Sequence, residues 1–264
     1  MLNINNVSKV FNEGTINEIK VIDKLNVAIN DGEFLTIVGS NGAGKSTLLN
    51  LIAGSFNLDE GNVILQDNDI SNISEHKKAK FIARVFQDPT KGTSPSMTIL
   101  ENLSLADNKG RRFGFSFGID KRKIEFFKEQ LAILNLGLEN KLNTKVGLLS
   151  GGQRQALSLL MATLKTPKLL LLDEHTAALD PKTSETIMQI TDKIVKEKDI
   201  TTLMITHNLN HALDYGNRIV MMHQGKIVLD KQGISKKSLT KEKLIEQFNS
   251  VTLNGDFDDR VILA

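Results

Sequence analysis

The sequence of 264 residues contains no cysteine. This absence excludes a disulfide framework, a thiolate metal site and a cysteine nucleophile. Tryptophan is also absent and tyrosine occurs once, whereas membrane-spanning chains usually carry both residues at the bilayer interfaces. No apolar run approaches the ~20 residues that cross a bilayer, and residues 1–10 lack the apolar core of a secretory signal. These absences favour a soluble protein of the reducing cytoplasm.

The charge balance of the chain is close to neutral. Lys and Arg together number 33 and Asp and Glu number 31, which gives a formal net charge of +2. A dedicated nucleic-acid binder usually carries a strong basic excess, so we expect no nucleic-acid partner. Apolar residues make up 40% of the chain, enough for a sizeable core in one large domain or two small ones. The sequence shows no internal repeat, which favours one unit.

Apolar alternation and apolar runs predict the strands. Apolar residues alternate over residues 25–29, a turn signal follows at 30–33, and residues 34–38 form a short apolar run. This pattern predicts a hairpin that enters the core. Four consecutive leucines at 169–172 are typical of a central parallel strand, which is buried on both faces. Further strands are predicted at residues 62–65, 84–86, 201–206, 218–222 and 226–230, the last two as a late hairpin.

Helical spacing dominates much of the remaining chain. An irregular stretch at residues 88–144, which includes Pro89 and Pro95, predicts a helical insertion with loops. Its helical pattern lies over residues 122–134. Other helices are predicted at residues 153–165, which are dense in Ala, Leu and Met, at 183–197 and at 236–248, the last as a charged surface helix followed by a tail at 249–264.

A glycine-rich loop follows the apolar run at 34–38. Gly39 to Ser46 match the phosphate-binding pattern G-x-x-x-x-G-K-[ST] without a mismatch. The glycines allow successive N–H groups to point inward as an anion nest, and the helix predicted near Lys45 adds its positive N-terminal end. Lys45 can reach the β- and γ-phosphates of a nucleotide, and the Ser46 hydroxyl can ligate Mg²⁺. The alternative is a chance glycine-rich turn, which the flanking strand and helix disfavour.

Two acidic residues end the strand of leucines. Asp173 and Glu174 follow directly after it, and the carboxyl ends of such strands line the ligand crevice in open α/β sheets. Beside a phosphate loop, Asp173 is expected to hold Mg²⁺ and Glu174 to polarise the attacking water. His207 ends the next predicted strand and is expected in the same crevice, although a histidine at a strand end is often structural. The alternative for the two acids is a solvated turn after a core strand.

A second glycine pair opens the predicted helix at 153–165. Ser150 is a good N-cap residue, and Gly151 and Gly152 expose backbone N–H groups at the helix start. The segment is therefore a second potential anion site. Taken alone, it also fits a capped helix with flexible glycines.

Together these motifs resemble the ATP-binding cassette (ABC) ATPases. The segment from Leu149 to Gln155 (LSGGQRQ) is similar to the family signature, and the phosphate loop and LLLLDE are similar to its Walker A and Walker B motifs. Gln87 matches the Q-loop glutamine and His207 the switch histidine. Residues 176–180 (TAALD) match the D-loop. The resemblance covers about residues 1–230, with all the motifs in the family order.

The resemblance implies an α/β fold: a P-loop NTPase (RecA-like) core with an antiparallel β subdomain and an inserted α-helical subdomain. The cassette is expected over residues 1–230, with the helical insertion at about 88–160. Residues 231–264 are expected to form a C-terminal helix and tail. The implied reaction is the hydrolysis of ATP to ADP and phosphate, coupled to transport.

The resemblance also assigns the cofactors ATP and Mg²⁺ to particular residues. It implies catalytic roles for Glu174, His207 and Gln87. It implies Mg²⁺ ligation by Ser46, Gln87 and Asp173. Phe11 matches the aromatic that stacks on adenine in the family, and it also fits a core aromatic. The residues expected to contact ATP are Phe11, Gly39, Ser40, Asn41, Gly42, Ala43, Gly44, Lys45, Ser46, Thr47, Ser150, Gly151, Gly152, Gln153 and Asp180.

The partners follow from the same resemblance. Family members form a head-to-tail homodimer with ATP between Walker A of one chain and the signature of the other. Because the chain has one cassette and no predicted span, the resemblance implies integral membrane permease subunits, contacted through Gln87 and the segment after it. An extracytoplasmic substrate-binding protein is also implied. The expected location is cytoplasmic, peripheral on the inner face of the membrane.

One residue departs from the common family pattern. His175 follows Glu174, where many members carry proline. The string DEHTAALDP is similar to a bacterial importer subgroup associated with tryptophan, tyrosine or related small solutes. Two alternatives remain open: an exporter built from separate subunits, and a soluble ABC protein without a transport role. The basic runs at 111–112 and 121–123 fit either contact with anionic lipid or a solvated face.

Overall fold

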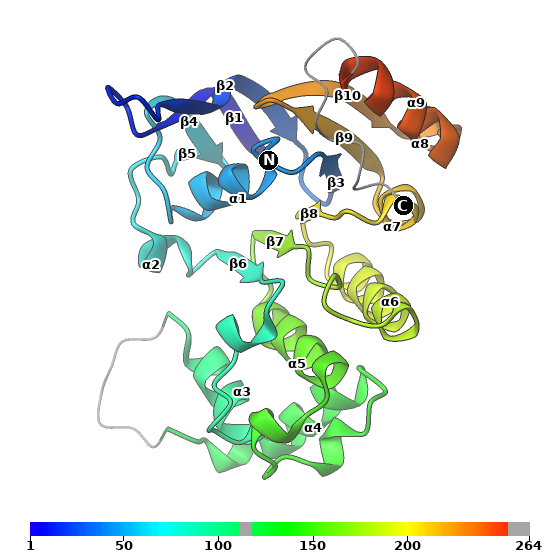
Figure 1. Ribbon diagram of the computed structural model, residues 1–264. Helices are drawn as coiled ribbons and strands as arrows, with labels where there is room; N and C mark the ends of the chain where they lie inside the picture. Colours follow the sequence, from blue (N-terminus) through cyan, green and yellow to red (C-terminus); the bar gives the residue numbers. More distant parts are fainter. Residues whose placement is uncertain (111–117, 253–264) are drawn as a thin grey trace. The chain divides into compact units, whose positions relative to one another are not determined.

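The computed structural model describes residues 1–110 and 118–252 (Figure 1). These residues form two compact units along the chain. The first unit contains Met1–Lys78 together with the chain from Thr201 onward, and the second contains Ala79–Ile200. No helix among the described residues is long and apolar enough to cross a membrane.

An antiparallel sheet occupies one side of the first unit. It contains β1 (Leu2–Phe11), β2 (Ile19–Ile29), β4 (Glu60–Leu65) and β5 (Asn68–Asp69) in the order β2-β1-β4-β5. Strand β1 pairs antiparallel with both β2 and β4. Alternate residues of these strands are buried, because one face of an antiparallel sheet covers a core while the other meets solvent. This sheet is the antiparallel β subdomain that the resemblance implies.

The phosphate loop follows a strand of the other sheet in this unit. That sheet contains β3 (Phe34–Gly39), β8 (Thr202–Ile205), β9 (Arg218–His223) and β10 (Lys226–Gln232), in the order β10-β9-β3-β8. Strand β3 is parallel to β8 and to β9, and β9 pairs antiparallel with β10 as the predicted late hairpin. The central strands β3 and β8 are almost entirely buried, which is usual for parallel strands that are covered on both faces.

The predicted hairpin over residues 25–38 is wrong. Strand β2 pairs with β1, whereas β3 pairs with β8 and β9 in the other sheet. The turn between them is closed locally: the Glu33 carboxylate accepts hydrogen bonds from the backbone N–H (3.0 Å) and side-chain amide (2.9 Å) of Asn30. Arg218 at the start of β9 pairs with the same carboxylate at 3.0 Å. Residues 30–33 therefore do form a turn, and this turn connects strands of two different sheets.

The described part of the first unit contains five helices beside its sheets. They are α1 (Lys45–Ala53), α2 (Glu75–Lys78), α7 (Leu209–Asp214), α8 (Ile234–Lys237) and α9 (Lys241–Thr252). The charged helix predicted at 236–248 is thus two helices. Its surface location is confirmed, because most residues of α9 are exposed. Two residues on the inner face of α9, Leu244 and Phe248, are buried in one cluster with Val38 and Met221. Helix α9 extends beyond the predicted start of the tail at residue 249, and residues 253–264 lie outside the described residues.

The second unit combines two strands with a group of helices. Strands β6 (Ile82–Val85) and β7 (Leu169–Asp173) are parallel, with Val85 opposite Leu172. The helices are α3 (Ile99–Asn108), α4 (Ile124–Ala132), α5 (Gly151–Thr163) and α6 (Pro181–Glu197). Short 3-10 helices lie at Pro89–Lys91, Lys121–Lys123, Leu138–Asn140 and Val146–Leu148.

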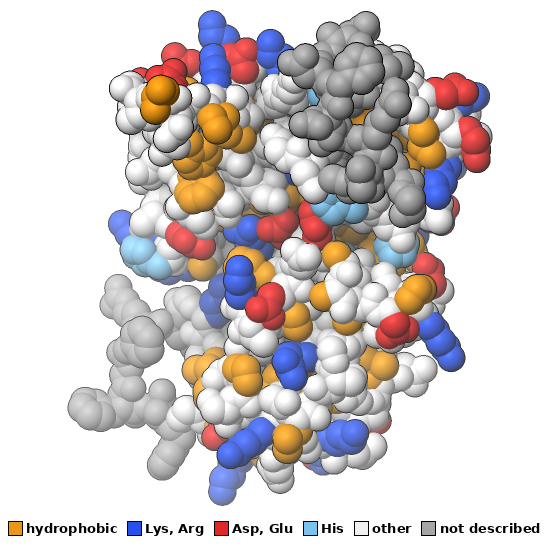
Figure 2. Space-filling model, viewed as in Figure 1, with side chains coloured by type: hydrophobic (Ala, Val, Ile, Leu, Met, Phe, Trp, Pro, Cys, Tyr) orange, Lys and Arg blue, Asp and Glu red, His pale blue; other side chains and the backbone are white. Residues whose placement is uncertain are grey.

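The basic run at 121–123 lies at the start of the α4 segment in this unit. Arg122 pairs with Asp120 at 2.9 Å and Lys123 pairs with Asp107 at 2.6 Å, so acids lie beside two of its three cations. Figure 2 shows acidic and basic side chains interspersed on the face in view. These ion pairs support the solvated-face interpretation of this run. The basic pair at 111–112 lies outside the described residues.

Candidate nucleotide site

The phosphate loop connects β3 to α1 through glycines in unusual backbone conformations. Gly39 has a φ of +151°, and a Cβ at this residue would lie 2.1 Å from the carbonyl oxygen of Met222 on β9. Gly44 has a φ of +95°, and its Cβ would lie 2.9 Å from the carbonyl oxygen of Val21. Neither place accepts a side chain without movement of the backbone. The glycine pattern of the motif is therefore required by the packing of the sheet around the loop.

The first turn of α1 is open toward the loop. Its N-cap is Gly44, which has no side chain that could accept a hydrogen bond from the N–H groups of this turn. The ammonium of Lys45 donates to the carbonyl oxygens of Gly39 and Ser40, at 2.7 Å each, and the lysine is buried. A helix N-terminus with uncapped N–H groups and an adjacent cation is suited to bind phosphate. Asn41 and Ser46 are exposed on the same loop.

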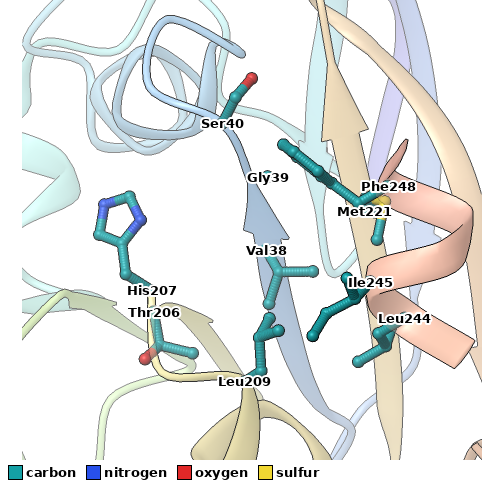
Figure 3. Close-up of a pocket in the computed structure, with 10 residues that line it drawn as sticks. All are labelled: Val38, Gly39, Ser40, Thr206, His207, Leu209, Met221, Leu244, Ile245 and Phe248. Atoms are coloured by element: carbon teal, nitrogen blue, oxygen red, sulfur yellow. The ribbon is translucent and has the colours of Figure 1, made fainter. Parts of the chain in front are cut away.

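His207 lies beside this loop within the first unit. It follows β8, and together with Gly39 and Ser40 it lines a small cavity (Figure 3). The other side of the cavity is apolar, with Leu209, Leu244 and Phe248 among its residues. Its volume of about 30 Å³ matches that of about one water molecule, so we regard it as a packing gap. The structure thus places His207 beside Gly39 and Ser40 of the phosphate loop, and its role at the γ-phosphate stays a prediction.

Phe11 lies at the end of β1 and is partly exposed. Its ring contacts the ring of Phe56 edge to face at a centroid distance of 5.4 Å, and the Lys9 ammonium lies 5.4 Å from its centroid. Phe56 follows the end of α1 and was not predicted from the sequence. An exposed aromatic pair can stack on a base, and it also stabilises the strand end by itself. Adenine stacking by Phe11 therefore stays a prediction.

The two acids of the second unit follow β7. Its four leucines are fully buried, and Asp173 lies at the end of the strand. Asp173 accepts a hydrogen bond from Arg84 on β6 at 2.5 Å, and the Arg84 guanidinium stacks on Phe86 at 4.7 Å. The sequence analysis did not assign Arg84 a role. The signal that was available is an arginine inside an otherwise apolar strand, which usually means that a carboxylate lies nearby.

Glu174 occupies a strained position directly after this strand. Its φ is +47°, in the left-handed region that residues with a side chain seldom adopt. The N–H of Ala177 donates to the Glu174 carbonyl at 2.9 Å and closes a turn. Such strain often marks a functional residue. Gln87 is exposed. Val85 of β6 is paired with Leu172 of β7, and Gln87 and Glu174 each follow two residues after that pair.

The signature segment begins α5. Ser150 is the N-cap, and it forms a capping box: its hydroxyl accepts from the Gln153 N–H at 3.2 Å, and the Gln153 side chain accepts from the Ser150 N–H at 3.3 Å. A Cβ on Gly152 would lie 2.3 Å from the Cγ2 atom of Thr183 in the first turn of α6. The second glycine is therefore required where α5 meets α6.

Asp180 lies in the same part of the second unit as the signature. It is the N-cap of α6, and its carboxylate accepts from the Thr183 N–H at 3.1 Å. Hydrogen bonds from Thr183 hold the pKa of the Asp180 carboxyl below its usual value. Leu179, the residue before it, would be 3.5 Å from a Cβ on Gly151. Asp180 and the two signature glycines thus lie at neighbouring helix starts.

The predicted site residues fall into two groups. The phosphate loop, Phe11 and His207 belong to the first unit; the signature, Gln87, Asp173, Glu174 and Asp180 belong to the second. Among the described residues, no three His, Cys, Asp or Glu side chains converge as a metal site. The residues expected to hold Mg²⁺ instead offer a hydroxyl, an amide oxygen and a carboxylate. These hard oxygen donors fit Mg²⁺ when it also keeps waters and phosphate oxygens.

Comparison with known proteins gives consistent matches. A family model described as ABC transporter matches residues 22–177. The chain is 50% identical over 248 residues to a tyrosine transport ATP-binding protein of Clostridioides difficile (strain R20291), covering 94% of this chain and 98% of the relative. It is 34% identical over 253 residues to a phosphonates import ATP-binding protein of Lactococcus lactis subsp. lactis (strain IL1403), with coverage of 94% and 98%.

A solved structure is similar along most of the chain. It is a dimeric ATP-binding cassette in a post-hydrolysis state, bound to ADP and phosphate. The two chains are 32% identical with a TM-score of 0.74, and the match covers 88% of this chain and 98% of the other.

Proposed function

This chain belongs to the ABC transporter family as an ATP-hydrolysing cassette, and we propose that it powers an importer whose cargo is tyrosine or a related small amino acid. The 50% identity to a tyrosine transport ATP-binding protein, along nearly the full length of both chains, supports this cargo. The identity to the phosphonates import relative is lower over the same share of the chain. The cargo itself is selected by other subunits.

The observation that carries the ATPase function is the open N-terminus of α1. Its N–H groups have no side-chain cap, and the Lys45 ammonium lies over the same loop. ATP brings polyanionic phosphates to such a site, with Phe11 available to the adenine ring. When bound, Mg²⁺ neutralises phosphate charge, and Ser46, Gln87 and Asp173 are the residues that would hold it.

We assign the hydrolytic roles to residues around the strand ends. Glu174 polarises the attacking water, since its carboxylate can accept a proton from it. His207 donates a hydrogen bond to the γ-phosphate side of the site from the end of β8. Gln87 links the site to the permease contact, because it begins the exposed segment that leads from β6 into the helical region.

The assembly that we propose is a head-to-tail homodimer bound to two permease subunits, at the inner face of the membrane. A substrate-binding protein delivers the cargo on the other side. Because the similar solved cassette is a dimer in its post-hydrolysis state, a dimeric working form is supported. In that dimer the Ser150 segment of one chain would contact ATP on the phosphate loop of the other.

The test is reconstitution with a matched variant. The tagged chain is purified from detergent-solubilised membranes with its co-purifying integral membrane subunit and placed in proteoliposomes. We expect ATP hydrolysis to rise when the substrate-binding protein is loaded with tyrosine. We also expect Glu174→Gln to bind ATP and stop turnover. Stimulation by another cargo alone would overturn the tyrosine assignment, and hydrolysis by Glu174→Gln within a few-fold of the wild type would overturn the role of Glu174.

A further inference from the structure

The loop from Glu174 to Asp180 connects β7 to α6 and begins with a strained residue. Glu174 has a φ of +47°, which a residue with a side chain adopts only when its surroundings enforce it. The turn closed by Ala177 fixes the carbonyl of Glu174. A second contact is needed to fix the backbone after Glu174, where the chain continues into His175.

His175 is anchored in the middle of α6. Its side chain is 2% exposed, and its Nε2 atom lies 3.2 Å from the hydroxyl oxygen of Thr191, which is fully buried. That hydroxyl donates to the carbonyl oxygen of Ile187 at 2.7 Å. A hydroxyl has one hydrogen, so the bond to His175 must be donated by Nε2–H. The contact therefore fixes both the position and the tautomer of the imidazole.

The anchor is rigid because of where Thr191 lies. Its helical neighbours Ile187, Met188, Ile194 and Val195 are all buried. The first turn of the same helix is capped by Asp180, at the other end of the loop. Both ends of the loop are thus held by α6, one through His175 and the other through Asp180.

We propose that His175 is a positioning residue for Glu174, and that its hydrogen bond to Thr191 holds the Glu174 carboxylate in place for hydrolysis. This rests on the proposed role of Glu174 as the residue that polarises water. Without the bond, Glu174 relaxes toward the broad allowed regions of φ and its carboxylate moves away from the working position. Misplacement of a reacting group by about 1 Å can cost ~100-fold in rate. Binding of ATP depends on other residues and is retained.

The decisive variant is Thr191→Val, which removes the hydroxyl and keeps the shape. We expect kcat for ATP to fall at least about tenfold while KM stays within about twofold. Thr191→Ser restores the hydroxyl and is expected to recover kcat to within about threefold of the wild type. The matched control is Thr186→Val. The Thr186 hydroxyl also donates to the carbonyl oxygen four residues earlier, that of Lys182 at 3.0 Å. Thr186 lies roughly 140° around the helix axis from Thr191.

The same bond is tested from the histidine side. His175→Gln keeps an Nε2–H donor and His175→Met removes it at similar length, so we expect the glutamine variant to retain several-fold more kcat. Because these two variants leave α6 unchanged, they decide the question even if Thr191→Val does not fold. Equal kcat in the two would overturn the proposal.

A double variant separates this inference from the proposed function. If Thr191 acts through Glu174, Glu174→Gln with Thr191→Val has the same residual rate as Glu174→Gln alone. A further tenfold loss in the double variant, or an equal fall in Thr186→Val and Thr191→Val, would overturn the positioning role. Normal turnover by Glu174→Gln would instead overturn the role of Glu174 itself.

Discussion

Helices α1 and α5 both begin at a glycine-rich segment, yet only one of them is capped by a side chain. The first turn of α1 has Gly44 as its N-cap, and Gly44 has no side chain that could cap it. The first turn of α5 has a complete capping box between Ser150 and Gln153. A helix leaves its first N–H groups without partners inside the helix, so a missing cap leaves them available to a ligand. The two ends therefore differ in how ready they are for an anion.

This difference indicates a division of roles. At α1, the N–H groups and the Lys45 ammonium are ready for phosphate within one chain. At α5, the capping box already occupies the N–H groups of Ser150 and Gln153, so fewer N–H groups of this turn remain for a phosphate. We therefore expect α1 to account for ATP affinity, and α5 to contribute only when an ATP already bound to another chain is brought against it.

The C-terminal ends of the two helices are alike. Lys78 donates to the carbonyl oxygens of Leu51 and Ile52 at the end of α1, and Lys198 donates to the carbonyl oxygen of Thr163 at the end of α5. Burial lowers the pKa of both lysines. A cation at a helix C-terminus offsets the unpaired carbonyl groups there. The functional contrast is thus confined to the N-terminal ends.

The largest effect is expected from Gly39→Ala at the open end. The added Cβ would lie 2.1 Å from the Met222 carbonyl, at a φ of +151°. We expect a loss of roughly 2–5 kcal/mol in the free energy of unfolding and no measurable ATP binding. Gly42→Ala is the control, because its Cβ would meet nothing within 4 Å although its φ is also positive. Thermal unfolding and ATP titration of both variants measure these effects. Equal stability of the two variants would contradict the steric role of Gly39.

Lys45→Ala is expected to weaken ATP binding without unfolding the chain. It removes a charge-assisted hydrogen bond to phosphate, worth about 1.5–3 kcal/mol. That corresponds to a rise in Kd of roughly 10- to 150-fold, measured by calorimetric titration of the monomer. Circular dichroism controls for folding, because the ammonium also bonds to Gly39 and Ser40. An unchanged Kd would show that the open end of α1 does not hold the phosphates.

Gly152→Ala tests the closed end through its packing. The added Cβ would lie 2.3 Å from the Cγ2 atom of Thr183. We expect a loss of about 1–3 kcal/mol in the free energy of unfolding, with ATP affinity of the monomer unchanged. Thr183→Ser removes that methyl group and keeps the backbone N–H that donates a hydrogen bond to Asp180. The double variant Gly152→Ala with Thr183→Ser should therefore recover stability. If stability is not recovered, the contact with Thr183 is not the cause.

Ser150→Ala removes the cap of α5. We expect a loss of about 1 kcal/mol in the free energy of unfolding, because the Gln153 N–H loses its acceptor. Steady-state hydrolysis should fall while Kd for ATP in the monomer stays the same. Denaturant unfolding and ATP titration on one preparation measure both. A weaker ATP affinity would contradict the division of roles.

The last prediction concerns the pH dependence of stability and a buried lysine, Lys236. Its ammonium donates to the carbonyl oxygens of Tyr215 and Gly216, after α7, and burial lowers its pKa to about 8. The unfolded lysine keeps a pKa near 10.5, so above pH 8 the unfolded state binds more protons. Stability therefore rises with pH, by about 1 kcal/mol between pH 8 and 9. Lys236→Met should remove this rise in urea unfolding, and an identical slope would contradict it.

The sequence was sufficient to predict those elements and loops whose structure depends on local residue patterns. The apolar runs at 34–38 and 169–172 predicted strands in the core, and β3 and β7 confirm them. The phosphate loop, with its glycine spacing, was predicted residue by residue, and its strand–loop–helix context is confirmed. These features depend on local sequence and on burial alone.

The remaining features depend on contacts between distant residues. The turn at 30–33 does not reveal that β2 and β3 lie in different sheets, since that depends on which strands are available as partners. The pairing of Arg84 with Asp173 requires the register of β6 and β7. The anchor between His175 and Thr191 requires α6 to pack under the loop. The burial of Leu244 and Phe248 on α9 likewise depends on the surface offered by β9.

The division of roles between the two helix ends is tested most directly by ATP titration of two monomeric variants side by side. Lys45→Ala changes the open end and Ser150→Arg changes the closed one. We predict that Lys45→Ala loses at least about tenfold in affinity, while Ser150→Arg binds ATP as the wild type does and fails in hydrolysis. An equal loss of ATP affinity in monomeric Ser150→Arg would contradict the assignment of ATP binding to the open end of α1.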